Sequence, residues 1–118
     1  MFTVELLTGA ATVASGEQAA ALIASTLNRG ALGCAAQVLG LAQRMIDLSV
    51  QYTSERQQFG KPIGSFQAVK HHMANVAVRL EYAKAPTHRA AYAVAMGQDI
   101  AAHAVSHAKI VACEAANL

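Results

Sequence analysis

The chain has 118 residues, of which 54% are hydrophobic and 14% are charged, so it can build one folded domain and is unusually apolar for a soluble one. Its net charge of +2 comes from scattered Lys and Arg residues, which argues against a nucleic-acid-binding surface. The longest uncharged run, between Arg29 and Arg44, is too short to span a membrane, and 27 alanines with only two prolines favour helix.

The N-terminal segment differs from the rest of the chain. Phe2 to Leu7 have strand-like character and Thr8-Gly9 can turn, so residues 1–15 are predicted to be an extended arm or the remnant of a preceding β-domain. The first residues lack the basic start of a signal peptide. We therefore expect a cytoplasmic or organelle-matrix location, with residues 16–118 forming an incomplete helical bundle domain.

A long helix is predicted from Ser15, the expected N-cap with Gln18 three residues later, to about Ser54. Gly30 and Gly33 are expected either to bend it or to allow a backbone or a ligand to approach closely. Two neighbouring apolar rows make its buried face wider than a coiled-coil stripe. The first row is Ala31, Cys34, Val38, Leu41, Met45, Leu48 and Tyr52, and the second is Ala35, Leu39, Ala42, Ile46 and Val50.

A second helix is predicted to start with Ser65 as its N-cap, to kink or restart at Pro86, and to end at Gly97. Asp99 is expected to cap a third helix. The predicted buried row of the second helix is Phe66, Val69, Met73, Val76, Leu80 and Ala83. The predicted row of the third is Ile100, Ala104, Ala108, Val111 and Ala115.

Three long amphipathic helices with short connections predict an all-α, up-and-down bundle, one helix short of the common four. One apolar seam would then stay open. We expect it to be covered either by a partner chain or by the rest of a longer protein.

Outside the connection between the first and second predicted helices, few side chains favour catalysis or metal binding. Cys34 and Cys113 are predicted to be buried and unreactive, and His103 with His107 is predicted to be a polar pair rather than a metal site. Most of the acids read as helix caps or surface partners, among them Arg44–Asp47 and Glu81–Lys84 as i, i+3 pairs. No catalytic residue and no metal ligand is assigned.

The turn from Arg56 to Gln67 concentrates a fixed cation, amides and aromatic rings. Arg56 suits a pyrophosphate, Gln58 and Gln67 can bond polar ring atoms, and Phe59 or Phe66 can pack on a flat ring. The alternative is structural: Gly60 takes a left-handed conformation after the helix, Pro62 stops the helix, and a hydrophobic anchor follows.

The same stretch resembles the C-terminal helical domain of the acyl-CoA dehydrogenases. Arg-x-x-Phe-Gly at Arg56, followed by Phe66-Gln67, is a specific motif, and the likeness runs from about residue 28 to the end through 36–44 and 52–63. The resemblance implies that FAD binds between subunits and that Arg56 reaches the pyrophosphate of a neighbouring subunit's FAD. It further implies a flavin-site lining of Gln57, Gln58, Phe66 and Gln67, with Phe59 packed beside it.

By this resemblance the chain is part of a flavin-dependent enzyme that performs α,β-dehydrogenation of an acyl-CoA, working as an oligomer of like subunits with an external electron acceptor. Alone it is expected to be inactive. Some family members place the catalytic base near the residues that match Asn28 to Ala31, where this chain has no carboxylate. The alternative is a non-catalytic helical assembly module.

Overall fold

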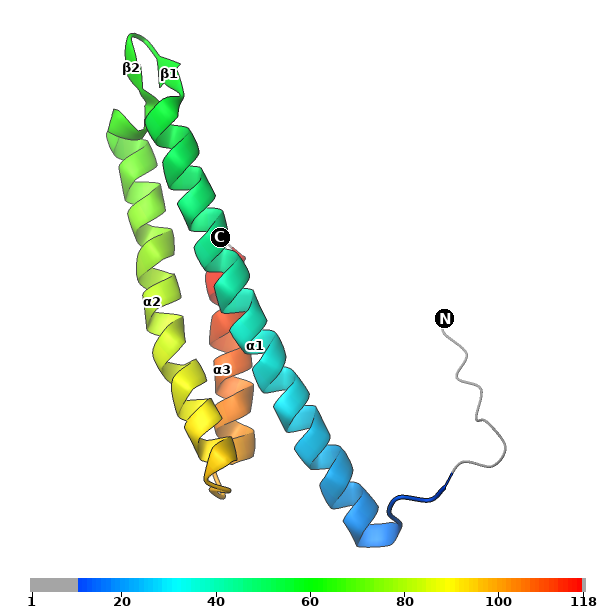
Figure 1. Cartoon of the computed structure of the whole chain (residues 1–118). Coiled ribbons are helices and arrows are strands. Elements are labelled where there is room, and N and C mark those ends of the chain that lie inside the picture. The colour runs from blue at the N-terminus through cyan, green and yellow to red at the C-terminus, as the bar shows by residue number, and fades with distance from the viewer. Residues whose placement is uncertain (1–10, 118) are drawn as a thin grey trace.

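Three helices dominate the computed structural model, which describes residues 11–117 (Figure 1). They are α1 (Gly16–Glu55), α2 (Gln67–Ala95) and α3 (Ala101–Ala116). A hairpin of β1 (Gln57–Gln58) and β2 (Lys61–Pro62), followed by the 3₁₀ turn η1 (Ile63–Ser65), joins α1 to α2. The arrangement confirms the predicted all-α, up-and-down bundle. The strand-like stretch predicted at residues 2–7 lies outside the described residues.

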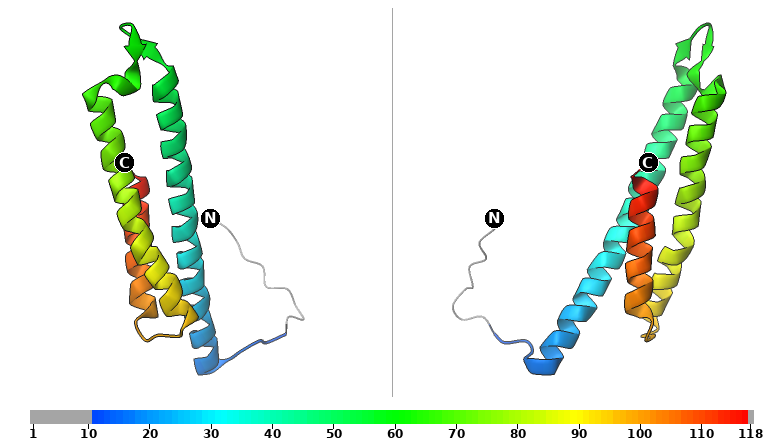
Figure 2. Two further views of the ribbon diagram at one scale, coloured as in Figure 1. Left: turned by 60° about the vertical axis from the view of Figure 1, so that its left-hand side comes forward. Right: turned by 180° about the vertical axis from the view of Figure 1, so that it is seen from behind.

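The helices differ greatly in length. α1 has 40 residues and α3 has 16, which correspond to about 60 Å and 24 Å at 1.5 Å per residue. Figures 1 and 2 show that α3 accompanies only the half of the α1–α2 pair that lies away from the hairpin. The hairpin therefore stands at the end of a two-helix stalk.

Both ends of α1 lie close to their predicted positions. Ser15 is the N-cap, but its hydroxyl makes no capping hydrogen bond, so the predicted capping box does not form. The helix extends one residue past the predicted Ser54, and Arg56 is the C-cap. Gly30 and Gly33 lie within an uninterrupted helix, and nothing lies within 4 Å of a Cβ built on either, so no described segment approaches them closely.

α2 corrects two predictions. Its N-cap is Phe66, because Ser65 belongs to η1. The helix also continues without a restart through Pro86. Pro86 has no N–H to donate to the Tyr82 carbonyl, but Tyr82 is exposed, so a water molecule can donate to that carbonyl instead. The Thr87 hydroxyl donates to the Ala83 carbonyl at 2.9 Å.

The turn between α2 and α3 follows from one glycine. Gly97 adopts a φ of 61°, and the Gln98 N–H then reaches back to the Ala93 carbonyl at 2.9 Å, as in a Schellman motif. The predicted end of α2 is therefore confirmed. Asp99 does not cap α3, however: the N-cap is Ile100, with no side-chain cap bond.

The core is built mainly from alanine. One cluster joins Ala35, Leu39 and Ala42 of α1 to residues of both other helices, and a smaller one surrounds Val105. Small side chains let helix backbones approach closely, so their contacts come from backbone and Cβ atoms. The other buried apolar residues are Leu80, Ala83, Ala90, Ala93, Ala108, Ala112 and Ala115. The predicted row of α3 omitted Val105 and Ala112, which are buried, and included Ile100, which is 42% exposed.

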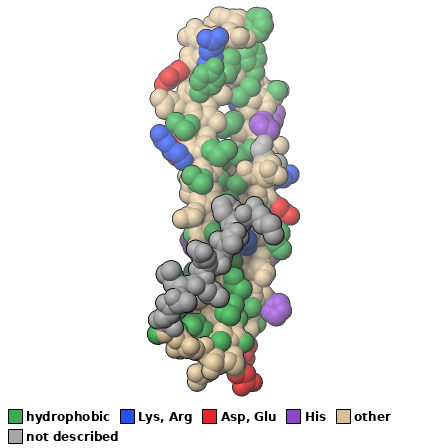
Figure 3. All heavy atoms as spheres, turned by 90° about the vertical axis from the view of Figure 1, so that its right-hand side faces the viewer, with side chains coloured by type: hydrophobic (Ala, Val, Ile, Leu, Met, Phe, Trp, Pro, Cys, Tyr) green, Lys and Arg blue, Asp and Glu red, His purple; other side chains and the backbone are tan. Residues whose placement is uncertain are grey.

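The first predicted row of α1 is largely not buried. We call its exposed members the α1 outer row: Cys34, Leu41, Met45, Leu48 and Tyr52. Leu41 is 65% exposed and Tyr52 60%. The prediction that Cys34 is buried is wrong because no described residue covers this side of the helix, and Cys113 is half-buried. Hydrophobic side chains are also common on the face of the molecule that Figure 3 shows.

Leu80 tests where the core lies. Its side chain is 1% exposed, and Leu80→Ala is expected to lower the free energy of unfolding by about 2–4 kcal/mol because it leaves a cavity among the three helices. The control is Val78→Ala on the same helix, where Val78 is 52% exposed and the loss should stay under about 1 kcal/mol. Chemical denaturation followed by circular dichroism measures both, and equal losses would contradict this core.

Candidate functional site

A tight hairpin places the predicted binding residues. Gln57 pairs with Pro62 and Gln58 with Lys61, and the turn between the strands consists of Phe59 and Gly60. Both turn residues have positive φ, 52° and 76°, as a type I′ turn requires. Gly60 is thus left-handed as predicted, but it lies in the hairpin turn and not directly after the helix.

The base of the hairpin is fixed to the end of α1. The Ile63 N–H donates to the Arg56 carbonyl at 2.8 Å. Gly64 lies against the last turns of α1, where a Cβ on Gly64 would come within 3.0 Å of the Thr53 carbonyl oxygen. The absence of a side chain at residue 64 allows this close contact, which sets the angle between hairpin and helix.

The two phenylalanines contact each other at the tip. The rings of Phe59 and Phe66 pack edge to face with centroids 6.3 Å apart, and the Lys61 ammonium lies 4.4 Å from the centre of the Phe66 ring. Phe59 is nevertheless 89% exposed. Lys61 was not among the predicted site residues, and the signal that could have found it is its register opposite Gln58.

All six predicted residues lie at this one end of the molecule. Arg56 is the C-cap of α1, Gln57 to Phe59 belong to the hairpin, and Phe66 and Gln67 begin α2. Phe66 is half-buried and the other five are exposed.

The charges at this end favour an anion. Within residues 11–117, Arg56 forms no ion pair, and the neighbouring Glu55 carboxylate accepts a hydrogen bond from Gln51 at 3.0 Å. The first turn of α2 has no side-chain cap, so its free N–H groups add partial positive charge on the same side. Two cations, amides and aromatic rings without a paired acid suit a ligand that combines phosphate with a flat ring.

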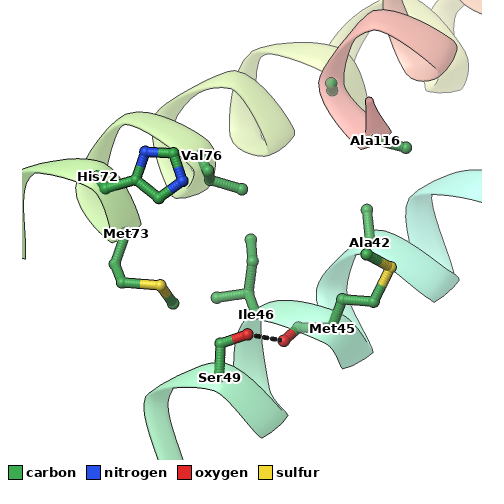
Figure 4. A pocket seen from close by; sticks show the side chains of 9 residues that line it. Ala42, Met45, Ile46, Ser49, His72, Met73, Val76 and Ala116 are labelled. Atoms are coloured by element: carbon green, nitrogen blue, oxygen red, sulfur yellow. Dashed lines mark hydrogen bonds between the residues drawn. The ribbon is translucent and has the colours of Figure 1, made fainter. Parts of the chain in front are cut away.

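A separate pocket opens between α1 and α2 beyond the end of α3 (Figure 4). Its volume is about 200 Å³, and Met45, Ile46, Met73 and Val76 make most of its wall apolar. His72 stands at its edge, while the Ser49 hydroxyl donates to the Met45 carbonyl within α1. Ala115 and Ala116, at the end of α3, form one edge of the pocket.

The remaining polar predictions have mixed outcomes. Glu81 and Lys84 form the predicted ion pair, but Asp47 accepts a hydrogen bond from Gln43 at 3.0 Å and does not pair with Arg44.

Among residues 11–117, no three His, Cys, Asp or Glu side chains gather where they could hold a metal ion. None of the helices described here is both long enough and apolar enough to cross a membrane.

Comparison with known proteins identifies the class. Residues 20–118 match the family described as "Acyl-CoA dehydrogenase, C-terminal domain". A crystal structure from Mycobacterium smegmatis, assigned as an acyl-CoA dehydrogenase, superposes with a TM-score of 0.76 at 33% identity, covering 81% of this chain and 25% of that one. The chain therefore belongs to the acyl-CoA dehydrogenase family, whose members are flavoprotein oxidoreductases of lipid metabolism, and the resemblance drawn from the Arg56 motif is confirmed.

Individual relatives carry several activities in their names. The short/branched chain specific acyl-CoA dehydrogenase of rat mitochondria is 46% identical over 93 residues, which are 79% of this chain and 21% of the relative. A 3-(aryl)acrylate reductase of Clostridium sporogenes is 42% identical over 91 residues, or 77% of this chain and 24% of the relative. The chain thus spans about a fifth to a quarter of the length of these relatives.

A pair of glycine substitutions tests the packing of the hairpin on α1. Gly64→Ala should destabilise the fold by about 1–3 kcal/mol, because the new methyl group meets the Thr53 backbone at 3.0 Å. Gly40→Ala, inside α1 with open space around it, should instead stabilise it by about 0.5–1 kcal/mol through helix propensity. Urea titration measures the change in unfolding free energy for each variant. No change for Gly64→Ala would mean that this contact does not hold the hairpin.

Proposed function

We propose that this chain serves as the C-terminal helical part of an FAD-dependent acyl-CoA dehydrogenase, which removes hydrogen across the α,β bond of an acyl-CoA thioester. The observation that carries the proposal is the gathering of Arg56 with three amide side chains and the Phe59–Phe66 pair at one end of the stalk. FAD supplies the acceptor for the β-hydride when bound. The proposed location is the cytoplasm or an organelle matrix.

Each side chain at the tip has a proposed task toward the cofactor. Arg56 binds the pyrophosphate with its planar fork of donors, since it has no competing ion pair among residues 11–117. The amides of Gln57, Gln58 and Gln67 bond polar atoms of the flavin or its ribityl chain. Phe66, half-buried and fixed by Lys61 and Phe59, offers an apolar surface to the ring system.

The proposed site is shared between subunits. The tip is exposed on all described sides, so this chain alone cannot exclude water from a cofactor. The α1 outer row offers the apolar surface that an oligomer interface needs. We infer that like subunits cover this row and that each tip contributes to a cofactor held mainly by a neighbour.

The names of the relatives support a cofactor role over a substrate-selecting one. Dehydrogenases and reductases both match this chain, among them a caffeyl-CoA reductase complex subunit of Acetobacterium woodii at 46% identity over 66 residues, or 56% of this chain and 17% of the relative. Because enzymes named for different substrates share this segment, we infer that it contributes to the cofactor site and not to the choice of substrate. We assign no catalytic base to the chain. We propose that the remaining domains supply this base and most of the acyl pocket, and that electrons leave to an external acceptor.

Arg56 is the residue whose loss should weaken cofactor binding most. In a flavin-loaded oligomer that contains this chain, Arg56→Gln should raise the FAD dissociation constant about 10- to 100-fold, since a charged hydrogen bond contributes about 1.5–3 kcal/mol. The matched control is Arg44→Gln, an exposed position on the same helix away from the tip. Fluorescence titration after flavin removal measures both constants. Equal effects would contradict the assignment of Arg56.

The 118-residue chain alone is expected to hold little FAD. After incubation with excess FAD and gel filtration, the protein peak should lack stoichiometric absorbance near the visible flavin bands. Retention of one flavin per chain would contradict a site completed by other domains and subunits.

The alternative, a non-catalytic assembly module, is also compatible with the α1 outer row. It predicts concentration-dependent self-association of the chain that FAD does not alter and no loss of function for Arg56→Gln. Analytical ultracentrifugation with and without FAD measures the first of these, and the Arg56 titration decides between the two functions.

A further inference from the structure

Lys109 and Cys113 form a close pair that the proposed flavin site does not use. They lie one turn apart on α3, and the Lys109 ammonium donates a hydrogen bond to the Cys113 sulfur at 2.8 Å. The other lysines have different surroundings: Lys84 pairs with Glu81 and Lys61 lies over a ring. Among the described residues, Lys109 is the lysine that donates a hydrogen bond to a thiol.

The sulfur of this pair can be reached from the surface. Cys113 is a free, half-buried thiol, and it lines a surface hollow of about 440 Å³ together with Val38 of α1 and the end of α3. The more exposed Cys34 lies on the facing helix and also acts on the Lys109 charge.

The sulfur also affects the pKa of the amine in this pair. The pKa of Lys109 is raised, chiefly by its hydrogen bond to Cys113 and next by the charge of the same sulfur, while loss of solvent acts in the opposite direction. An acyl group on the sulfur weakens its capacity to accept a hydrogen bond from the ammonium. The amine should then release its proton more readily and become a nucleophile.

We propose that Lys109 is a site of self-acylation by acyl thioesters, with Cys113 as the first acceptor. The Cys113 thiolate attacks the thioester carbonyl, a new carbon–sulfur bond forms, and the bond to the original thiol breaks. The neutral Lys109 amine then attacks the same carbonyl carbon, forming an amide and releasing the Cys113 thiolate. Overall, the lysine ammonium and the acyl thioester give an acyl-lysine, a free thiol and one proton, with no oxidant or reductant.

Proximity carries the second step. The nitrogen lies 2.8 Å from the sulfur, and the acyl carbon would be one bond beyond that sulfur. Transfer between groups held this close proceeds as an intramolecular reaction with a large effective concentration. The proposal shares its substrate class with the proposed function, but it needs neither flavin nor oligomer, so either can fail without the other.

The test is incubation of the 118-residue chain with acetyl-CoA, followed by peptide mass spectrometry of all four lysines: Lys61, Lys70, Lys84 and Lys109. Lys109 should be acetylated at least about tenfold faster than Lys70, an exposed lysine without a thiol contact. Cys113→Ser should reduce the Lys109 rate to that of Lys70, whereas Cys34→Ala should change it far less, because Cys34 is the smallest influence on the Lys109 pKa. Circular dichroism establishes that both variants are folded.

A second variant separates the two steps. Lys109→Arg keeps the positive charge but cannot accept the acyl group, so an acetyl thioester should accumulate on Cys113 and disappear on treatment with hydroxylamine, which leaves amides intact. Acetylation of Lys109 no faster than Lys70, an unchanged Lys109 rate in Cys113→Ser, or no thioester in Lys109→Arg would each overturn the proposal.

Discussion

The close packing of α3 against α1 and α2 through alanine is the contact on which the rest of the structure depends. α3 contributes Ala108, Ala112 and Ala115 to a core whose larger buried side chains are few, chiefly Leu39, Leu80 and Val105. Because alanine buries little area, each contact contributes little, and cohesion comes from the length over which the backbones run together. Within residues 11–117, the pocket beside Met45 and Met73 lies next to the last residues of α3.

That boundary divides the chain into a packed half and an exposed half. The half with α3 holds nearly all of the fully buried residues, whereas the other half consists of two helices, the hairpin and a surface rich in apolar side chains. The residues proposed to bind the cofactor all lie in the exposed half. Under the proposed function, a neighbouring subunit would bury its apolar surface and help to enclose a ligand at its polar tip.

The helices were predicted well, because hydrophobic periodicity and the conformational preferences of glycine and proline are local properties of the sequence. α1 and the Gly97 turn were found almost to the residue. Three kinds of error remain. Pro86 was given too much weight, since an exposed carbonyl can turn to water, and the two α1 rows could not be ranked by burial. The side-chain caps expected at Ser15, Ser65 and Asp99 do not form. Both rows are equally apolar, so only the position of α3 decides that Ala35 is buried and Cys34 is not.

The candidate site was predictable in its residues but not in its shape. Arg56 and the Phe-Gln pair identify the family from sequence alone. The hairpin was not expected, since its turn is Phe59-Gly60 and a phenylalanine at positive φ has no propensity signal. Lys61 and the role of Gly64 follow from that hairpin, so they could be recognised only once its register was known.

The stalk has a further thermodynamic consequence. Within residues 11–117 only α1 and α2 carry the tip, so its position would respond to whatever binds its sides and its end. If a subunit interface and a cofactor both select the same stalk geometry, their binding free energies are coupled. Each must then strengthen the other by the same factor, and loss of either would loosen both.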